Sequence, residues 1–260
     1  MTKKGIVKKN TLIALIVAII IGLSTIILLQ FDLIHRIKDK LCSKIYDQEN
    51  TISSKDEIGN IYGIDVSHHQ KTIDWQKVKR WENKKISFVY IKATEGATYL
   101  DKRYQTNLNG AKKNNLLVGS YHYFRTTSSV KDQFDNFIKN VDKDKQDLIP
   151  LIDVEEKSNW SNSEFHENFQ EFLDMVENHF GSKPMIYTVN SFYNHHLSGK
   201  YNSYYFLIGR YGKNIPNMRD NSSWMVWQFS ETGKVNGITK DVDIDVINKK
   251  YSLNDLLLKK

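Results

Sequence analysis

The stretch Leu148-Ile-Pro-Leu-Ile-Asp-Val-Glu155 is an apolar run that ends in two carboxylates spaced two residues apart. Such a short apolar run is typical of a buried strand, whose side chains alternate between two faces. Asp153 and Glu155 would therefore point the same way, about 6 to 7 Å apart at a rise of roughly 3.3 Å per residue. That separation suits acid/base chemistry on a glycosidic bond. On this motif alone, a strand that runs out into a solvated acidic turn fits as well.

Seven further runs on either side of this stretch also read as strands. The eight predicted strands are residues 61–66, 86–94, 116–124, 148–155, 184–189, 205–211, 225–230 and 242–247. The first four connections carry helical patterns, clearest over residues 104–115 and 164–180. Helical connections of that length imply parallel strands. The fifth connection has room for a short helix only, and the last two read as loops.

This order predicts an α/β fold, a modified TIM-like (β/α)5(β)3 barrel. In such barrels the active site lies at the carboxyl ends of the strands. Polar and aromatic residues do end the predicted strands, which agrees with that rule. They are Asp65, Thr94, Glu95, Tyr121, Tyr123, Asp153, Glu155, Tyr187, Tyr211 and Gln228.

The composition and the net charge of the chain limit the kinds of molecule that it is expected to bind. The chain has 260 residues, 40% of them hydrophobic, which is enough for a substantial core, and a net charge of +7. No basic stripe runs along one face, which argues against nucleic acid, whereas a mildly basic surface suits an anionic polymer such as a cell wall. Cys42 is the single cysteine, so an internal disulfide is excluded, and its flanking residues favour a free thiol over a lipidation site.

The N-terminal region predicts a membrane segment. Residues 1–11 form a basic tail, and residues 12–29 carry no charge, which as a helix nearly spans a bilayer core. We expect a transmembrane anchor or signal segment over residues 12–31, with an uncleaved anchor favoured over a cleaved signal. The positive-inside rule then places the tail in the cytoplasm and exports the rest. Residues 32–60 read as a linker and residues 61–260 as the catalytic domain.

Asp65 ends the first predicted strand. In a closed barrel it would share the mouth with Asp153 and Glu155, and like charges confined together raise at least one pKa. The alternative is a turn or N-cap aspartate, a role for which Asp74 is better placed, before a predicted helix containing Trp75.

Lys92 interrupts an apolar strand, where an ammonium needs a carboxylate partner unless it reaches the rim. Several aromatic residues could stack on sugars or belong to the core: Tyr99, Tyr121, Tyr123, Tyr187 and Trp227. Neither of the adjacent histidine pairs, His68-His69 and His195-His196, has the spacing of a metal site. We expect no metal and no cofactor, because no phosphate-binding loop, serine elbow or catalytic cysteine is recognisable either.

Six blocks of sequence resemble, in the same order, those of the glycoside hydrolase family 25 lysozymes, and together they cover about 190 of the 260 residues. They are Gly63-Ile-Asp-Val-Ser-His-His-Gln70 with Ile73-Asp-Trp75, Phe88-Val-Tyr-Ile-Lys-Ala-Thr-Glu-Gly96, Val118-Gly-Ser-Tyr-His-Tyr-Phe124, Pro150-Leu-Ile-Asp-Val-Glu155, Trp227-Gln-Phe-Ser230 and Val242-Asp-Ile-Asp245.

The resemblance implies a barrel of five β/α units plus three strands that hydrolyses the β-1,4 bond between N-acetylmuramic acid and N-acetylglucosamine in peptidoglycan. Glu155 would be the general acid and Asp153 the second catalytic carboxylate. Asp65 and Asp243 would line the same pocket. Residues expected to contact or support the substrate are Lys92, Glu95, Tyr99, Tyr121, Tyr187 and Trp227. The partner is then the glycan strand, and we expect a monomer.

The chain departs from the family pattern at three places. Lys71 stands where glycine is usual, Phe206–Gly209 replaces a Trp-x-Ala sequence, and Asp245 stands where asparagine is common. We expect Asp245 to add negative charge near Asp243 and to shift the pH optimum.

The sequence leaves the reaction route open. Asp153 could orient the substrate's own 2-acetamido group or activate water with inversion. Two rival functions remain: an inactive membrane-anchored wall-binding module, and a chitinase-like enzyme that shares the Asp-x-Glu motif. The intact carboxylates oppose the first, and the blocks at Trp227 and Asp243 oppose the second.

Overall fold

The computed structural model describes residues 57–259. The membrane segment expected at residues 12–31, the tail before it and most of the linker lie outside the described residues. None of the helices within 57–259 is both long and apolar enough to cross a bilayer.

The described residues form ten strands and eight helical segments. In chain order they are β1 (Ile58–Val66), η1 (His68–Gln70), β2 (Arg80–Trp81), β3 (Lys84–Glu95), β4 (Tyr99–Leu100), α2 (Tyr104–Lys113), β5 (Leu117–Tyr123), α3 (Val130–Asn140), η2 (Lys143–Lys145), β6 (Leu151–Asp153), α4 (Asn162–Phe180), β7 (Met185–Val189), α5 (Asn190–Phe192), the π-helical turn η3 (Tyr193–Leu197), β8 (Phe206–Gly209), β9 (Val226–Gly233), β10 (Val242–Asn248) and η4 (Leu253–Leu256).

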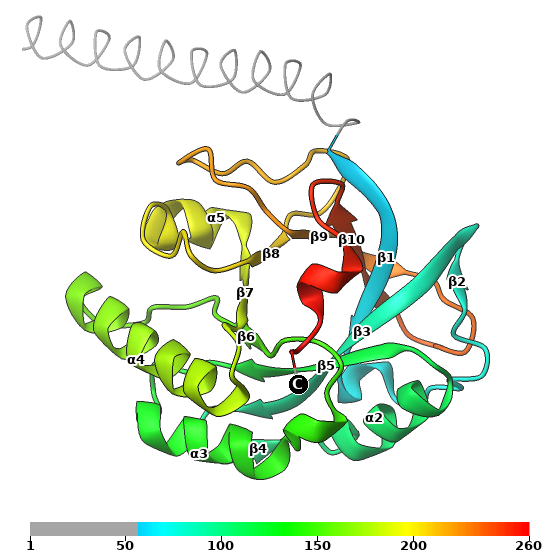
Figure 1. Cartoon of the computed structure of the whole chain (residues 1–260), viewed down its shortest axis with the longest axis horizontal. Helices are drawn as coiled ribbons and strands as arrows, with labels where there is room; N and C mark the ends of the chain where they lie inside the picture. Colours follow the sequence, from blue (N-terminus) through cyan, green and yellow to red (C-terminus); the bar gives the residue numbers. More distant parts are fainter. Residues whose placement is uncertain (1–56, 260) are drawn as a thin grey trace, which may run out of the picture. The chain divides into compact units, whose positions relative to one another are not determined.

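Eight of the strands close into a barrel (Figure 1). The hydrogen-bonded order is β1-β10-β9-β8-β7-β6-β5-β3, and pairing of β1 with β3 closes the ring. Seven strands run parallel, while β10 is antiparallel to both of its neighbours, β1 and β9. The barrel therefore presents the carboxyl ends of seven strands and the amino end of β10 at one mouth.

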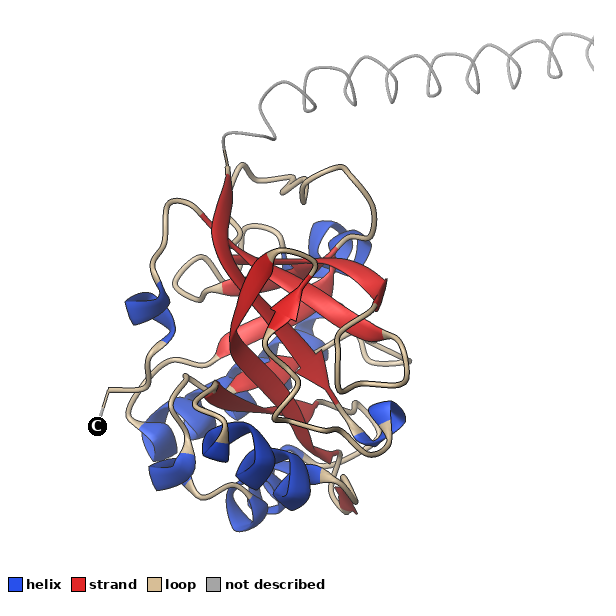
Figure 2. Ribbon diagram, turned by 90° about the vertical axis from the view of Figure 1, so that its right-hand side faces the viewer, coloured by secondary structure: helices blue, strands red, loops and turns tan. Residues whose placement is uncertain are grey.

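The strands are apolar on both faces because helices cover much of the outside. In β3 the side chains of Phe88, Val89, Tyr90 and Ile91 are all fully buried. Helix α2 packs against β3 and β5, and α3 packs against β3 and α4. Figure 2 shows these helices gathered on one side of the strands.

Helix α4 follows from its sequence pattern. Phe165, Phe169, Phe172 and Val176 recur at helical spacing, and all four are fully buried. At its N-terminus Ser161 and Glu164 form a capping box, and at its C-terminus Gly181 adopts a left-handed conformation with φ 75°. The sequence prediction of a helix over residues 164–180 is therefore confirmed with an extension of two residues.

The eight predicted barrel strands are all present, which confirms the α/β barrel. The strand predicted over residues 148–155 is shorter, because Ile149 donates its N–H to Leu256 outside the barrel and Pro150 has no N–H to donate. The α-helix predicted in the first connection was wrong. Residues 67–83 hold only the 3-10 turn η1 and the strand β2, and η1 ends at Lys71, whose φ of 61° is incompatible with a continuing helix.

Candidate active site

A cavity of about 280 Å³ opens at the barrel mouth. Its lining residues come from seven barrel strands and the turns that follow two of them: Asp65, Tyr121, Leu151, Asp153, Glu155, Tyr187, Leu207, Tyr211, Gln228, Glu231 and Asp243. Asp243 lies near the start of β10, not the end, because β10 runs opposite to the other strands. Five carboxylic acids therefore face one small space.

Asp153 and Glu155 form the first pair of acids. Asp153 is the last residue of β6, and Glu155 follows two residues later, so both side chains reach the same cavity. They hydrogen-bond to each other, which requires one proton between them. Burial, followed by the charge of Glu155, raises the pKa of Asp153 well above its usual value. Burial also raises the pKa of Glu155, although the hydrogen bond from Asp153 opposes the rise.

Asp65 and Asp243 form the second pair. They lie directly opposite each other on the antiparallel strands β1 and β10, and their carboxyl groups are hydrogen-bonded. Burial, and then the charge of Asp243, raises the pKa of Asp65 well above its usual value. Burial raises the pKa of Asp243 to about 6.

Gln228 connects this second pair to the tyrosines of the mouth. Its amide nitrogen donates to Asp65 Oδ2 at 2.7 Å, and its amide oxygen accepts from the hydroxyls of Tyr187 at 2.9 Å and Tyr211 at 3.1 Å. Burial raises the pKa of Tyr211 to about 12 and that of Tyr187 well above its usual value, so both stay neutral donors. Gly209 leaves room for this arrangement, because a Cβ there would lie 2.8 Å from the Tyr187 hydroxyl oxygen.

Asp245 lies one layer deeper on the same face of β10. It is fully buried, and neither carboxyl oxygen has a hydrogen-bond partner among the described residues. Burial, and then the charge of Asp243, raises the pKa of Asp245 well above its usual value. Burial without a donor among the described residues favours the neutral acid. The charge of Asp245 also contributes to the raised pKa of Asp65, and the expected shift of the pH optimum stays a prediction.

Lys92 finds its carboxylate partner beside the cavity, not inside it. Its ammonium donates to Glu95 at 2.6 Å, and Glu95 also accepts from Arg125, which in turn bonds Glu156 at 2.8 Å. Burial tends to raise the pKa of Glu95, but the hydrogen bonds from Lys92 and Arg125 outweigh it and lower that pKa. The charge of Lys92 lowers the pKa of both Asp153 and Glu155.

The expected substrate residues divide into two groups. Tyr121 and Tyr187 line the cavity, whereas Lys92, Glu95 and Tyr99 lie outside its lining. Tyr99 is exposed, and its hydroxyl hydrogen-bonds His68 at 3.2 Å.

Trp227 was expected to contact or support the substrate, but it does not line the cavity. It is buried and donates its indole N–H to the backbone of Arg210 at 2.7 Å. Side chains alternate along a strand, so Gln228 points into the barrel and Trp227 points out, against Phe229 and Trp224.

Glu231 lines the cavity, although sequence reasoning did not single it out. The pairing of β9 with β10 shifts register twice near this residue, and such irregularities leave no recognisable sequence signal. Gln228 and Tyr211 were noted as strand-end residues, and that position was the available signal. No group of three or more potential metal ligands occurs within residues 57–259.

Comparison with known proteins places this geometry in a family. The sequence model of the glycosyl hydrolases family 25 matches residues 64–238. The chain is 37% identical to the uncharacterized protein YegX of Escherichia coli O6:H1 over 190 residues, which covers 72% of this chain and 70% of that protein. It is also 32% identical to Lysozyme M1 of Streptomyces globisporus over 215 residues, covering 77% of this chain and 71% of the lysozyme.

The barrel also resembles solved structures. A family 25 glycosyl hydrolase from Bacillus anthracis superposes with a TM-score of 0.67 at 31% sequence identity, covering 75% of this chain and 90% of that one. The matched family region, residues 64–238, includes Asp65, Asp153 and Glu155, and it ends before Asp243 on β10.

Proposed function

The chain belongs to the glycosyl hydrolases family 25, and from that membership we propose that Glu155 and Asp153 hydrolyse the β-1,4 bond between N-acetylmuramic acid and N-acetylglucosamine in peptidoglycan. The similarity to a lysozyme supports this substrate. The observation that carries the residue assignment is the hydrogen-bonded Asp153–Glu155 pair in a cavity at the carboxyl ends of the barrel strands.

Glu155 is the general acid in this proposal. A general acid must hold a proton at the working pH, and burial raises the pKa of Glu155 in that direction. It is also the more accessible member of the pair, because Asp153 is buried at the end of β6 whereas Glu155 lies on the turn beyond it. Glu155 is therefore placed to protonate the leaving oxygen of the glycosidic bond.

Asp153 has the role of orienting the substrate's 2-acetamido group. Direct inversion needs a water between the two carboxyl groups and a separation of about 6.5 to 9.5 Å. A hydrogen-bonded pair leaves no such gap, which favours attack by the acetamido oxygen. An acetamido N–H that donates to Asp153 would stabilise its anionic form and move the shared proton to Glu155.

The remaining cavity residues hold the sugar. Asp65, Asp243 and Gln228 form a polar wall that can accept and donate hydrogen bonds to hydroxyl groups. Tyr121 and Tyr187 supply flat surfaces with a hydroxyl edge. Lys92 and Glu95 act from outside the cavity, where Glu95 holds both Lys92 and Arg125. The charge of Lys92 lowers the pKa values of the catalytic pair, whereas the charge of Glu95 raises the pKa of Asp153.

The substrate of this reaction lies outside the cytoplasm, which agrees with an exported domain. We propose that residues 12–31 anchor the chain in the membrane and that the catalytic domain faces the wall. Cell fractionation of the full-length chain, combined with protease added from outside, tests this topology. Recovery of the domain in the cytosol would contradict it.

Digestion of purified peptidoglycan by the full-length chain tests the bond specificity. Mass spectrometry of the fragments should find new reducing ends on N-acetylmuramic acid. New reducing ends on N-acetylglucosamine would identify a glucosaminidase, and intact glycan would leave a binding module. Anomeric analysis of the first product should find retention, whereas inversion would refute the role of the acetamido group.

Glu155→Gln tests the general acid, and Glu156→Gln is its matched control. Both changes remove one carboxylate from the same turn, but only Glu155 lines the cavity. Loss of the acid should reduce turnover by about 10² to 10⁴. Full activity of Glu155→Gln, or an equal loss in both variants, would remove Glu155 from this role.

A further inference from the structure

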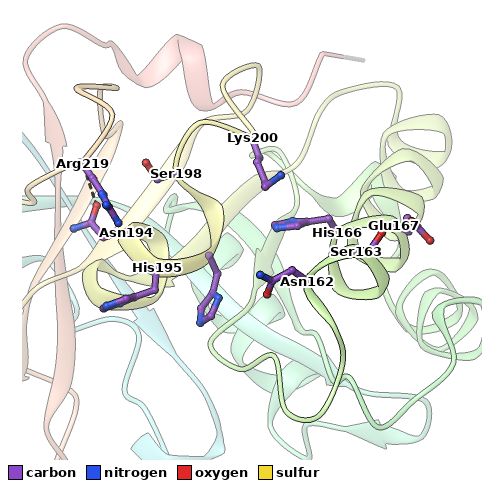
Figure 3. Close-up of a pocket in the computed structure, with 10 residues that line it drawn as sticks. Asn162, Ser163, His166, Glu167, Asn194, His195, Ser198, Lys200 and Arg219 are labelled. Atoms are coloured by element: carbon purple, nitrogen blue, oxygen red, sulfur yellow. Dashed lines mark hydrogen bonds between the residues drawn. The ribbon is translucent and has the colours of Figure 1, made fainter.

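A second cavity, of about 570 Å³, lies between the first turns of α4 and the segment that follows β7 (Figure 3). None of its lining residues is shared with the barrel cavity. Its basic lining residues are His166, His195, His196, Lys200 and Arg219, and its one acid is Glu167. The proposed reaction uses none of these side chains.

The two permanent cations of this cavity, Lys200 and Arg219, have no counter-ion in the part of the chain that the structure describes. Neither Lys200 nor Arg219 forms an ion pair with any residue between 57 and 259. The nearby acids are occupied by other donors. Glu167 accepts from the Ser163 hydroxyl at 2.7 Å, and Asp220 accepts from the Tyr193 hydroxyl at 2.9 Å. In Figure 3 the Glu167 carboxylate lies on the far side of α4 from Arg219.

Neighbouring positive charges contribute to the lowered pKa values of two of the histidines, His166 and His196. Burial, followed by the charges of Lys200 and His196, lowers the pKa of His166. Burial, followed by the charge of Lys157, lowers the pKa of His196. A group of basic side chains that forms no ion pair within residues 57–259 is complementary to an anionic ligand.

The donors surround the cavity on two sides. His166 projects from α4, while His195 and Arg219 project from the opposite wall, and Lys200 reaches towards His166 (Figure 3). A carboxylate presents two oxygens in one plane, whereas a phosphate presents its oxygens tetrahedrally and can accept from both walls at once. Asn162 and Ser198 add neutral hydrogen-bonding groups to the same space.

We propose that this cavity binds a phosphate group, and that its source is a phosphodiester in a polymer carried by the cell wall. The choice of a wall polymer rests on the proposed function, whereas phosphate binding itself does not. Two stretches of the chain contribute to both cavities. Glu155 after β6 and Tyr187 in β7 line the barrel mouth, whereas Asn162 at the start of α4 and Asn194 in η3 line this cavity. A polymer held here would keep the same wall segment close to the barrel mouth.

Binding of inorganic phosphate to the full-length chain tests the site directly. The ³¹P signal of inorganic phosphate should broaden saturably in the presence of the wild-type protein. Lys200→Gln combined with Arg219→Gln should weaken the affinity by at least about tenfold, because charge-assisted hydrogen bonds are lost. Lys79→Gln combined with Lys85→Gln is the matched control, since it removes two exposed charges without an ion pair elsewhere on the surface and should leave the affinity unchanged.

Absence of saturable broadening with the wild-type protein, or equal affinity in the Lys200/Arg219 variant, would overturn the site. Unchanged cleavage of phosphate-free peptidoglycan by that variant verifies that it is folded. Failure of the wild-type protein to cleave such peptidoglycan would count against the proposed function and not against phosphate binding.

Comparison of the KM on intact cell walls with the KM on walls stripped of phosphate polymers identifies the source of the bound phosphate group. The wild-type protein should have a lower KM on the intact walls, and the Lys200/Arg219 variant should lose this difference. An equal KM of the wild-type protein on both would overturn the wall phosphodiester as the ligand. A KM that depends on the stem peptide instead would assign the cavity to peptide carboxylates and would also overturn it.

Discussion

Asp245→Asn should stabilise the protein increasingly as the pH rises. The side chain is fully buried, and neither oxygen has a hydrogen-bond partner within the described residues, so burial raises its folded-state pKa well above the unfolded value. Between those two pKa values the folded chain holds a proton that the unfolded chain has released. Stability then falls with increasing pH by about 1.4 kcal/mol per pH unit. Asparagine has the same shape and no charge, so the variant lacks this dependence.

Urea denaturation of both proteins at several values between about pH 4.5 and 6.5 measures the effect. The difference in the free energy of unfolding should widen by about 1.4 kcal/mol for each pH unit and cease to widen above the folded-state pKa. Asp132→Asn is a matched control, because Asp132 is exposed in the first turn of α3, and its difference from the wild type should stay constant. Parallel pH dependences of Asp245→Asn and the wild type would refute the neutral, unpartnered acid.

Three further predictions concern the barrel mouth. Activity should fall as the pH rises past the raised pKa values of the Asp153–Glu155 pair, because the proposed general acid loses its proton. A pH–rate profile that stays flat would contradict this prediction. Lys92→Met should move that decline to higher pH, because the charge of Lys92 lowers both pKa values, and a shift to lower pH would exclude this electrostatic role. Gly209→Ala should reduce the free energy of unfolding by about 1 kcal/mol. The new Cβ would lie 2.8 Å from the Tyr187 hydroxyl oxygen and would disturb its hydrogen bond to Gln228. Unchanged stability in urea would show that the tyrosine moves aside without cost.

The sequence predicted the barrel well because its strands are buried on both faces. Apolar runs such as Phe88–Ile91 stand out against polar connections, and helical spacing in the α4 region separates consecutive strands. The prediction of a helix in the first connection was wrong for a local reason. Trp75 and Val78 are buried three residues apart, which resembles one face of a helix, but Lys71 has a positive φ of 61° that a helix does not allow.

Only those features of the site that depend on the sequence of a single strand could be predicted. Strand alternation places Asp153 and Glu155 in one cavity, but alternation cannot report which residues face each other across the barrel. The hydrogen-bonded pair of Asp65 and Asp243 depends on β10 running antiparallel to β1, and the buried state of Asp245 depends on the same register. Glu231 enters the cavity through an irregular register of β9, which has no sequence signature.

The two carboxyl pairs together set the charge of the barrel mouth. In both pairs burial raises the pKa values, which opposes full ionisation of the two acids. No lysine or arginine lines the cavity, and Lys92 acts from outside it through Glu95. The mouth therefore carries less negative charge than five fully ionised acids would supply. In the proposed reaction, the remaining negative charge would stabilise the positive charge of an oxocarbenium-like transition state more than it stabilises the neutral glycoside, which is the condition for catalysis by electrostatic preorganisation.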